Sequence, residues 1–222
     1  MSLRILAIDT TSDQGSIALA EDDRVLEEVA LASTDGYAHV LFDAIRDLLH
    51  RHSLRLNQVN GFASAAGPGA FTGVRVGLTA AKGLAEANAR RVVAVSNLEA
   101  LASFGTRALR AVVMDARRGQ VFGAIYDAAG QPVQQEVVTE LEAWLASLPK
   151  LVIKSDGLEI ITTLDLPPHI EVPVIRPPQA LASSVARIAA RRFAAGLGQD
   201  PAEIDANYVR RSDAELLWRD TS

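Results

Sequence analysis

Two stretches of the sequence carry residues that could hold a phosphate group. In residues 63–83, ASAAGPGAFTGVRVGLTAAKG, the loop Gly67-Pro68-Gly69 precedes an Ala/Gly-rich helix, and the N–H groups at a helix N-terminus bind anions. The turn after the first strand adds polar residues suited to nucleotide or Mg²⁺ contact, namely Asp9, Thr10, Thr11, Ser12 and Gly15. The alternative is a tight turn whose hydroxyl groups cap local backbone groups, and we favour it.

The chain offers few ligands for a metal ion. It has no cysteine, which excludes disulfides, thiol catalysis and cysteine-based zinc sites. His50 and His52 are two positions apart in a predicted helix and therefore face different directions. His39 and Asp43 have the i, i+4 spacing of a shared helix face, but we favour a solvated face beside an apolar stripe. We expect neither a catalytic metal nor a cofactor.

Two glycines inside the second predicted helix need a physical reason. Gly73, Gly77 and Ala81 recur every four residues within residues 72–89, and glycine within a helix costs about 1 kcal/mol relative to alanine. A phosphate site would explain glycine in the loop only, whereas close approach of another element explains both. That element is either internal, the helix at 37–52 or the sheet, or it belongs to a second chain. Arg75 opposes the helix dipole, and would suit an interface carboxylate, a phosphate or solvent.

The composition is that of a globular protein. The chain has 222 residues, of which 49% are hydrophobic and 22% are charged, and its net charge is −5. No basic patch stands out, which speaks against unaided binding of nucleic acid. No apolar run reaches the length of a membrane span, and the N-terminal residues predict a strand rather than a signal sequence. Together with the absence of cysteine, these features predict a cytoplasmic protein.

The hydrophobic periodicity predicts one order of elements twice. In the first half we expect strands at 4–11, 16–22, 24–32, 59–66 and 91–96, and helices at 37–52 and 72–89. In the second half we expect strands at 109–116, 121–127, 132–139, 151–157 and 170–175, a short helix between the last two strands, and helices at 140–148 and 183–196, with Gly196 as a C-cap. Both halves open on an aspartate at the end of a strand, a polar turn and a hairpin partner. The sequence therefore predicts an α/β fold of two tandem βββαβαβ lobes.

The first lobe is expected at residues 1–100 and a smaller second lobe at 101–222, with a linker near 97–108 and a C-terminal tail that packs back on the first lobe. Two such lobes resemble the actin/hexokinase-like (ASKHA) architecture. Four stretches make the resemblance specific: AIDTTSDQGSIAL, AGPGAFTGVRVGLTAAKGLAEA, VVMDARRGQVFGAIY and NYVRRSDAEL. In this order they are similar to the bacterial TsaB (YeaZ) family, the paralogue of the threonylcarbamoyl transferase TsaD, and the match covers nearly the whole chain.

The resemblance implies a non-catalytic subunit of the complex that makes threonylcarbamoyladenosine in tRNA. It implies that TsaD is the direct partner, that the ATPase TsaE joins through the complex, that tRNA is contacted indirectly, that the free chain pairs with itself as a homodimer, and that no membrane is involved. Asn97 and Leu101 stand where TsaD-like proteins carry a metal-binding histidine pair. Lys154-Ser155-Asp156-Gly157 stands where an adenosine-binding relative would carry a Gly-Gly pair. Both departures predict that the isolated chain turns over no substrate and binds ATP weakly or not at all.

In this family the two helices of the first lobe join the equivalent helices of TsaD in a four-helix bundle. The resemblance therefore implies a partner interface on helices 37–52 and 72–89. The expected interface residues are Val40, Leu41, Ala44, Ile45, Leu48, Gly73, Val74, Gly77, Leu78 and Ala81.

Three alternative functions remain open from the residues. One is an ATP-dependent kinase of the ASKHA architecture, in which Asp9 or Asp115 would be the catalytic carboxylate. Another is a metallopeptidase-like protein, which lacks a water-activating centre without the histidine pair. A third is a purely structural homodimer, which measurement of size with and without TsaD would distinguish.

Overall fold

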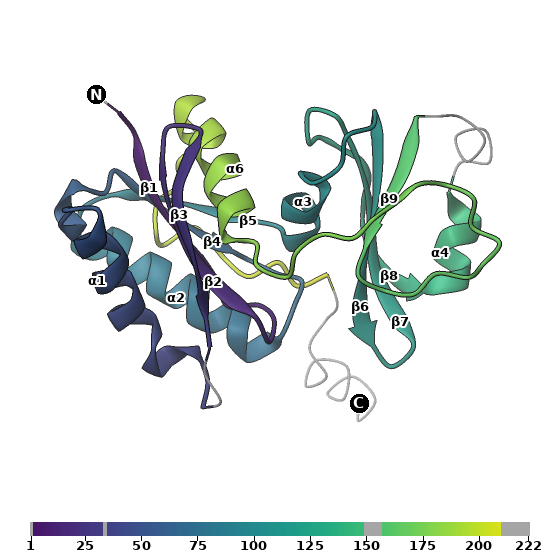
Figure 1. Ribbon diagram of the computed structural model, residues 1–222, viewed down its shortest axis with the longest axis horizontal. Helices are drawn as coiled ribbons and strands as arrows, with labels where there is room; N and C mark the ends of the chain where they lie inside the picture. The colour runs from purple at the N-terminus through teal and green to yellow at the C-terminus, as the bar shows by residue number, and fades with distance from the viewer. Residues whose placement is uncertain (1, 33–34, 149–156, 210–222) are drawn as a thin grey trace, which may run out of the picture. The chain divides into compact units, whose positions relative to one another are not determined.

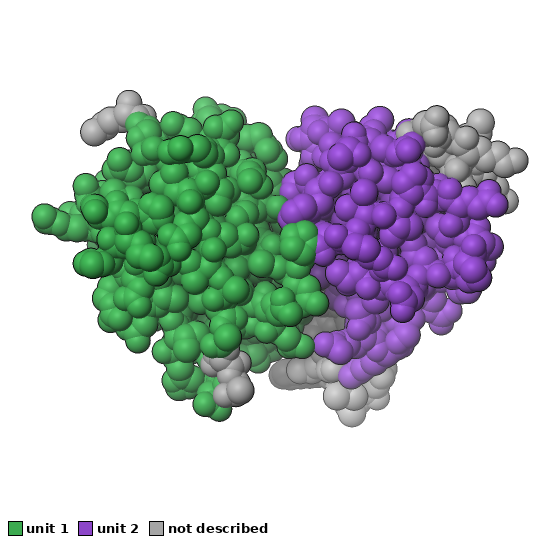
Figure 2. Space-filling view, viewed as in Figure 1, with its two compact units in different colours: residues 1–100, 178–206 green, residues 101–177, 207–222 purple. Residues whose placement is uncertain are grey.

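The computed structural model describes residues 2–32, 35–148 and 157–209. The chain divides into two compact units, which Figure 2 colours separately. Unit 1 comprises residues 1–100 and 178–206, and unit 2 comprises residues 101–177 and 207–222. Each unit is built around one five-stranded sheet.

The sheet of unit 1 has the strand order β3-β2-β1-β4-β5. Its strands are β1 (Arg4–Asp9), β2 (Gly15–Glu21), β3 (Arg24–Leu31), β4 (Gly61–Ala65) and β5 (Arg91–Val95). The first three form an antiparallel meander, and β4 and β5 add to β1 in parallel. Crossover connections through helices are required between such parallel strands, which is the βββαβαβ order expected from the sequence.

Helices cover both faces of this sheet (Figure 1). The helices α1 (Leu41–Arg51) and α2 (Phe71–Ala87) lie on one face, and α6 (Ala182–Ala194) lies on the other. Short helices η1 (Tyr37–His39), η2 (Leu56–Gln58) and α3 (Asn97–Ala102) complete the connections. Within the described part of the chain, the helices are too short or too polar for any of them to cross a bilayer.

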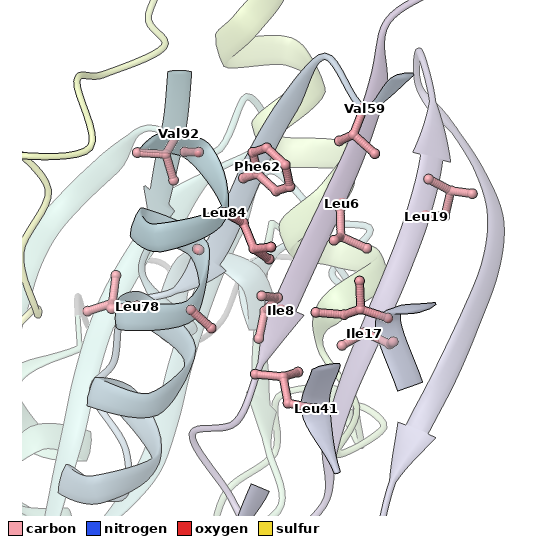
Figure 3. Close-up of a cluster of buried hydrophobic side chains, with 14 of the residues drawn as sticks. Leu6, Ile8, Ile17, Leu19, Leu41, Val59, Phe62, Leu78, Leu84 and Val92 are labelled. Atoms are coloured by element: carbon pink, nitrogen blue, oxygen red, sulfur yellow. The ribbon is translucent and has the colours of Figure 1, made fainter. Parts of the chain in front are cut away.

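The core of unit 1 lies between the sheet and the first two helices. Leu6 and Ile8 from β1, Phe62 from β4, Leu41 of α1 and Leu78 of α2 belong to one cluster of buried side chains, which Figure 3 shows in close-up. The apolar stripe predicted for residues 37–52 supplies the α1 side of this core. On the opposite face small residues bring α6 close: a Cβ at Gly61 would lie 2.5 Å from Cζ of Phe193.

Unit 2 repeats the arrangement of the first unit. Its strands are β6 (Leu109–Arg117), β7 (Gln120–Asp127), β8 (Pro132–Glu140), β9 (Leu158–Thr162) and β10 (Val174–Ile175), with α4 (Leu141–Ser147) after the meander. The order β10-β9-β6-β7-β8 corresponds strand by strand to β5-β4-β1-β2-β3. The tandem repeat of strands predicted from the sequence is therefore confirmed, but the second helix expected in this half is wrong, because residues 163–173 between β9 and β10 form turns, bends and irregular backbone rather than a helix.

Three expected boundaries differ from the structure. Residues 178–206, placed in the second lobe, belong to unit 1, because α6 packs on β1, β2 and β4. The fourth strand of unit 2 is Leu158–Thr162 rather than 151–157, of which residues 151–156 lie outside the described residues. The expected linker begins with the helix Asn97–Ala102. The predicted C-cap is confirmed: Gly196 has φ +73°, and Leu197 N donates to Arg192 O at 2.8 Å.

Candidate functional site

The turn after β1 is closed by its own hydrogen bonds. Asp9 is fully buried, and its Oδ1 accepts the backbone N–H of Thr11 at 3.0 Å and the Thr11 hydroxyl at 2.6 Å. The Thr10 hydroxyl donates to Gly73 O at 2.7 Å, and Ser12 Oγ accepts Gln14 N at 3.3 Å. Of the five residues considered for phosphate contact, Asp9, Thr11 and Ser12 thus bond within the turn, and Thr10 bonds to α2.

Tyr37 of η1 locks the far side of the same turn. Its hydroxyl donates to Ser12 O at 2.8 Å and accepts Gly15 N–H at 2.6 Å. A Cβ at Gly15 would lie 2.8 Å from Cζ of the Tyr37 ring, so glycine permits this close approach. Burial raises the pKa of the Tyr37 phenol, which keeps it neutral and able to donate.

The glycine loop and the start of α2 dock on this turn. Ala70 N donates to Thr11 O at 2.8 Å, and a Cβ at Gly69 would lie 2.6 Å from the same carbonyl oxygen. A Cβ at Gly73 would lie far inside 3.0 Å of Thr10 O. The glycines therefore allow backbone to meet backbone within one subunit, and the loop joins β4 to α2 tightly.

Asn97, at the expected position of the first histidine, is a buried clamp between two loops. Its Oδ1 accepts Gly67 N–H at 2.9 Å, its own backbone N–H donates to Gly67 O at 2.9 Å, and its Nδ2 donates to Thr11 Oγ1. Leu101, at the second histidine position, is buried and apolar. The carboxamide of Asn97 is thus engaged in holding the glycine loop against the β1–β2 turn.

Burial of the Asp9 carboxyl makes its charged form unfavourable. Desolvation raises its pKa above the ordinary 3.8, the Thr11 hydrogen bonds lower it in part, and nearby Glu28 raises it further. Its Oδ2 is buried and has no hydrogen-bond partner among the described residues. Burial of a carboxylate disfavours its charged form, so the folded chain holds this proton more tightly than the unfolded chain does.

Replacement of Asp9 by asparagine should remove one pH-dependent contribution to stability. Because the folded-state pKa of Asp9 is raised, the stability that this group contributes is full below pH 3.8 and is lost as the pH rises through the folded pKa. Relative to Asp9→Asn, the wild-type free energy of unfolding should fall by about 1.4 kcal/mol for each unit of raised pKa. Urea unfolding of both chains from about pH 3 to about pH 7 measures this difference. A difference that stays constant with pH would contradict it.

The N-terminus of α6 is filled by acceptors from the sheet. Ser16 Oγ accepts Ala182 N at 3.1 Å, and Glu28 accepts the Ser183 N–H at 2.9 Å and the Ser183 hydroxyl at 2.8 Å. These side chains lie more than 150 positions from the helix in sequence. The chain therefore supplies the negative charge that favours this end of the helix dipole.

Most residues of the expected partner strip lie in the core of unit 1, where they cannot form an exposed surface. Gly77 faces β1 and β4: a Cβ there would lie 2.6 Å from Thr10 Oγ1 and 3.0 Å from Ser64 Oγ. The other members share this inward direction. Leu41, Ile45, Leu48, Val74, Leu78 and Ala81 are buried in the core cluster, and Val40, Ala44 and Gly73 are half-buried.

Different residues are exposed on the same two helices. Phe42 in α1 and Phe71 in α2 are 55% and 48% exposed. The Arg75 guanidinium stacks over the Phe71 ring at 3.8 Å from its centroid. Gly83, also exposed, has no atom within 4 Å of where its Cβ would be. The sequence signal that was missed is aromatic residues and a glycine on helix positions outside the apolar stripe.

The remaining candidates are surface groups. Asp43 pairs with Arg46 at 2.7 Å rather than with the exposed His39, and His52 Nε2 lies 2.8 Å from Glu27. In the described ranges, no three His, Asp or Glu side chains are grouped as a metal site would need.

The position of an adenosine-binding Gly-Gly pair, after the fourth strand of unit 2, is occupied by Thr163-Leu164-Asp165. Gly157 precedes β9, so it is not the counterpart of a Gly-Gly pair, and residues 154–156 lie outside the described residues.

Known proteins resemble this chain in sequence. Residues 26–195 match the family model described as TsaD, tRNA N6-adenosine threonylcarbamoyltransferase. The tRNA threonylcarbamoyladenosine biosynthesis protein TsaB of Bacillus subtilis is 34% identical over 151 residues, 66% of this chain and 66% of that protein. The protein of the same name from Escherichia coli is 36% identical over 130 residues, 56% of this chain and 55% of that protein. The chain belongs to the TsaD family and, within it, to TsaB (YeaZ).

Solved structures extend the TsaB likeness along the chain. A Pseudomonas aeruginosa protein described as similar to peptidase YEAZ superposes with a TM-score of 0.79 at 26% identity, covering 94% of this chain and 100% of that one. YeaZ from Pseudomonas aeruginosa gives a TM-score of 0.76 at 25% identity, covering 93% of this chain and 99% of that one. The sequence matches to the two curated TsaB proteins span 66% and 55% of their lengths.

Proposed function

We propose that this TsaB-family chain is a non-catalytic subunit of the complex that makes threonylcarbamoyladenosine in tRNA. It binds a TsaD-type transferase through the outer faces of α1 and α2, and a TsaE-type ATPase joins through the complex. When the transferase is absent, the same surface pairs two copies of the chain. The observation that carries the proposal is the exposure of Phe42, Phe71 and Gly83 on these helices.

The two aromatic side chains belong to one edge of unit 1. The helices α1 and α2 each connect strands that run in the same direction, so both helices run back along the sheet. Phe42 and Phe71 lie in their first turns, which therefore face the same edge. Aromatic residues and arginine are enriched in protein interfaces, and Arg75 stacks on Phe71. We call the exposed residues Phe42, Phe71, Arg75 and Gly83 the outer surface.

Gly83 is a glycine inside α2 for which the described part of unit 1 supplies no close neighbour, unlike Gly73 and Gly77, which face β1 and the turn after it. Glycine in a helix interior costs about 1 kcal/mol relative to alanine, and the open space at Gly83 shows no offsetting contact within the described chain. A helix of a second chain that approaches closely would need this missing side chain. Two helices of this length can supply the roughly 800 Å² per partner of a standard interface.

The non-catalytic role is supported by the closed state of the β1–β2 turn. The backbone N–H groups of Thr11 and Gly15 and the hydroxyls of Thr10 and Thr11 have partners within unit 1. A kinase would need such groups available for phosphates. Asp115, the other carboxylate considered for a kinase, accepts Arg117 N at 2.7 Å in its own turn.

The test is the substitution Gly83→Leu. Leucine is a better helix former than glycine and its Cβ would have no described atom within 4 Å, so the chain should fold with unchanged circular dichroism and a slightly raised Tm. The larger side chain should hold the partner helix away, and the transferase subunit should be lost in a pull-down by at least about tenfold.

The matched control is Arg187→Leu, which places the same side chain on an exposed position of α6. This variant should retain the transferase. Gly83→Leu that folds and still binds would remove the outer surface as the interface. Failure of the wild-type chain to bind any TsaD-type subunit would remove the proposed function itself.

A further inference from the structure

The turn between β6 and β7 holds two arginines in an unfavourable backbone conformation. Arg117 has φ +64° and Arg118 has φ +57°, followed by Gly119 at +74°. In this left-handed region the Cβ of any residue other than glycine crowds its own carbonyl oxygen. Two-residue hairpin turns of this kind favour Asn-Gly or Gly-Gly, and a residue such as Arg117 at the adjoining register shift is usually glycine.

The Arg117 and Arg118 side chains lie at the surface of unit 2. The Arg117 side chain is 82% exposed and Arg118 is also exposed. Arg117 Nε lies 3.8 Å from Asp115 Oδ2, a long surface ion pair of a kind that adds little stability. Backbone strain retained at an exposed position is typical of residues that contact a ligand.

The turn between β6 and β7 differs from the turn at the same place in unit 1, between β1 and β2. The corresponding turn of unit 1 follows a buried aspartate, Asp9, and is closed by Tyr37. The turn of unit 2 follows an exposed aspartate, Asp115, and ends in two guanidinium groups. An aspartate accepts a backbone N–H in both turns, but Thr10 and Thr11 after Asp9 are buried, whereas Arg117 and Arg118 after Asp115 are exposed.

The chemistry of the tip fits phosphate. Guanidinium groups present rigid planar forks of N–H donors that match phosphate oxygens. The large apolar side chains that are exposed in the described part of the chain all lie outside residues 115–120. A protein interface needs apolar or aromatic residues at its centre, whereas contacts to a nucleic-acid backbone need only charged and polar donors.

We propose that Arg117 and Arg118 bind phosphate groups of the tRNA backbone, so that this chain touches the tRNA itself. The proposal rests on the proposed function for the identity of the RNA. It differs from the expectation that tRNA is contacted only indirectly, and it needs no extended basic patch. Two arginines anchor the tRNA, and other subunits supply the remaining affinity.

The experiment replaces both arginines by asparagine, which adopts positive φ more readily, so the turn should form as well as in the wild type. Binding of tRNA is measured by fluorescence anisotropy between about 50 and about 200 mM salt, for the chain alone and for its complex with a TsaD-type subunit. The slope of log K against log salt concentration should become shallower by about 2, and the affinity should fall by about tenfold or more. Arg117→Lys with Arg118→Lys should keep the slope and lose part of the affinity.

The control is Arg187→Asn, which removes an exposed charge from α6 and should leave the slope unchanged. An unchanged slope in the double asparagine variant, or no tRNA binding by either the chain or the complex, overturns the proposal. Loss of the TsaD-type subunit with an unchanged slope would assign the arginines to a protein contact and also overturn it. Because partner binding is read separately, these outcomes leave the proposed function standing unless the wild type binds no such subunit.

Discussion

Gly73→Ala should lower the free energy of unfolding of unit 1 by about 3 kcal/mol, at the upper end for overpacking. The added methyl would lie far inside 3.0 Å of the Thr10 carbonyl oxygen, and that oxygen is backbone within a turn held by Asp9. The first turn of α2 would have to move away from β1. Urea unfolding followed by far-UV circular dichroism measures the loss.

Gly83→Ala is the matched control, because it makes the same change in the same helix without a neighbouring atom. It should raise the free energy of unfolding by about 1 kcal/mol. The two variants should therefore change stability in opposite directions. Equal effects of the two substitutions would show that contact with Thr10 does not explain the inner glycine.

Glu159→Ala should destabilise unit 2 by about 3 kcal/mol, because it removes a buried acceptor and leaves the donors of Thr106 and Arg107 without it. Glu159 is 1% exposed in β9. Its carboxylate accepts the backbone N–H groups of Thr106 and Arg107, the latter at 2.7 Å, and the Thr106 hydroxyl at 3.3 Å. Trp144 is buried in the same unit and reports its unfolding by fluorescence when Trp218 is replaced by phenylalanine.

Glu159→Gln separates charge from shape in that site. Its carbonyl oxygen can still accept from Thr106 and Arg107, so the loss should be less than half of that for alanine. Equal losses for the two variants would mean that the negative charge, and not the presence of an acceptor, holds the 105–107 loop.

Local patterns predicted the architecture because they repeat. Alternating apolar residues and a polar turn after Asp9 and again after Asp115 are sufficient to predict two β meanders. The stripe of α1 and the cap at Gly196 are equally local. These features depend on residues within one turn or one hairpin, so the sequence contains them directly.

The predictions from sequence that differ from the structure concern contacts between segments that are far apart in the chain. The periodicity of α6 predicts a helix, but only the three-dimensional structure shows that its small-residue face packs on β1 and β4. Gly73 and Gly77 predict a close approach without identifying Thr10 as the group approached. Strand β9 was missed because Glu159 interrupts an apolar run, and this glutamate is buried to bind a loop more than 50 positions away.

Unit 1 is formed by two separate segments of the chain, residues 1–100 and 178–206, and this has a consequence for synthesis on the ribosome. The sheet is encoded by Val95, but the helix that covers its small-residue face starts at Ala182, after most of unit 2 has emerged. At about 5–20 residues per second, roughly 5–20 s pass between the two. During this interval the nascent sheet exposes one apolar face, whereas residues 101–177 emerge without interruption. Residues 1–100, which are translated first, therefore wait for residues 178–206 before the sheet of unit 1 is covered on both faces.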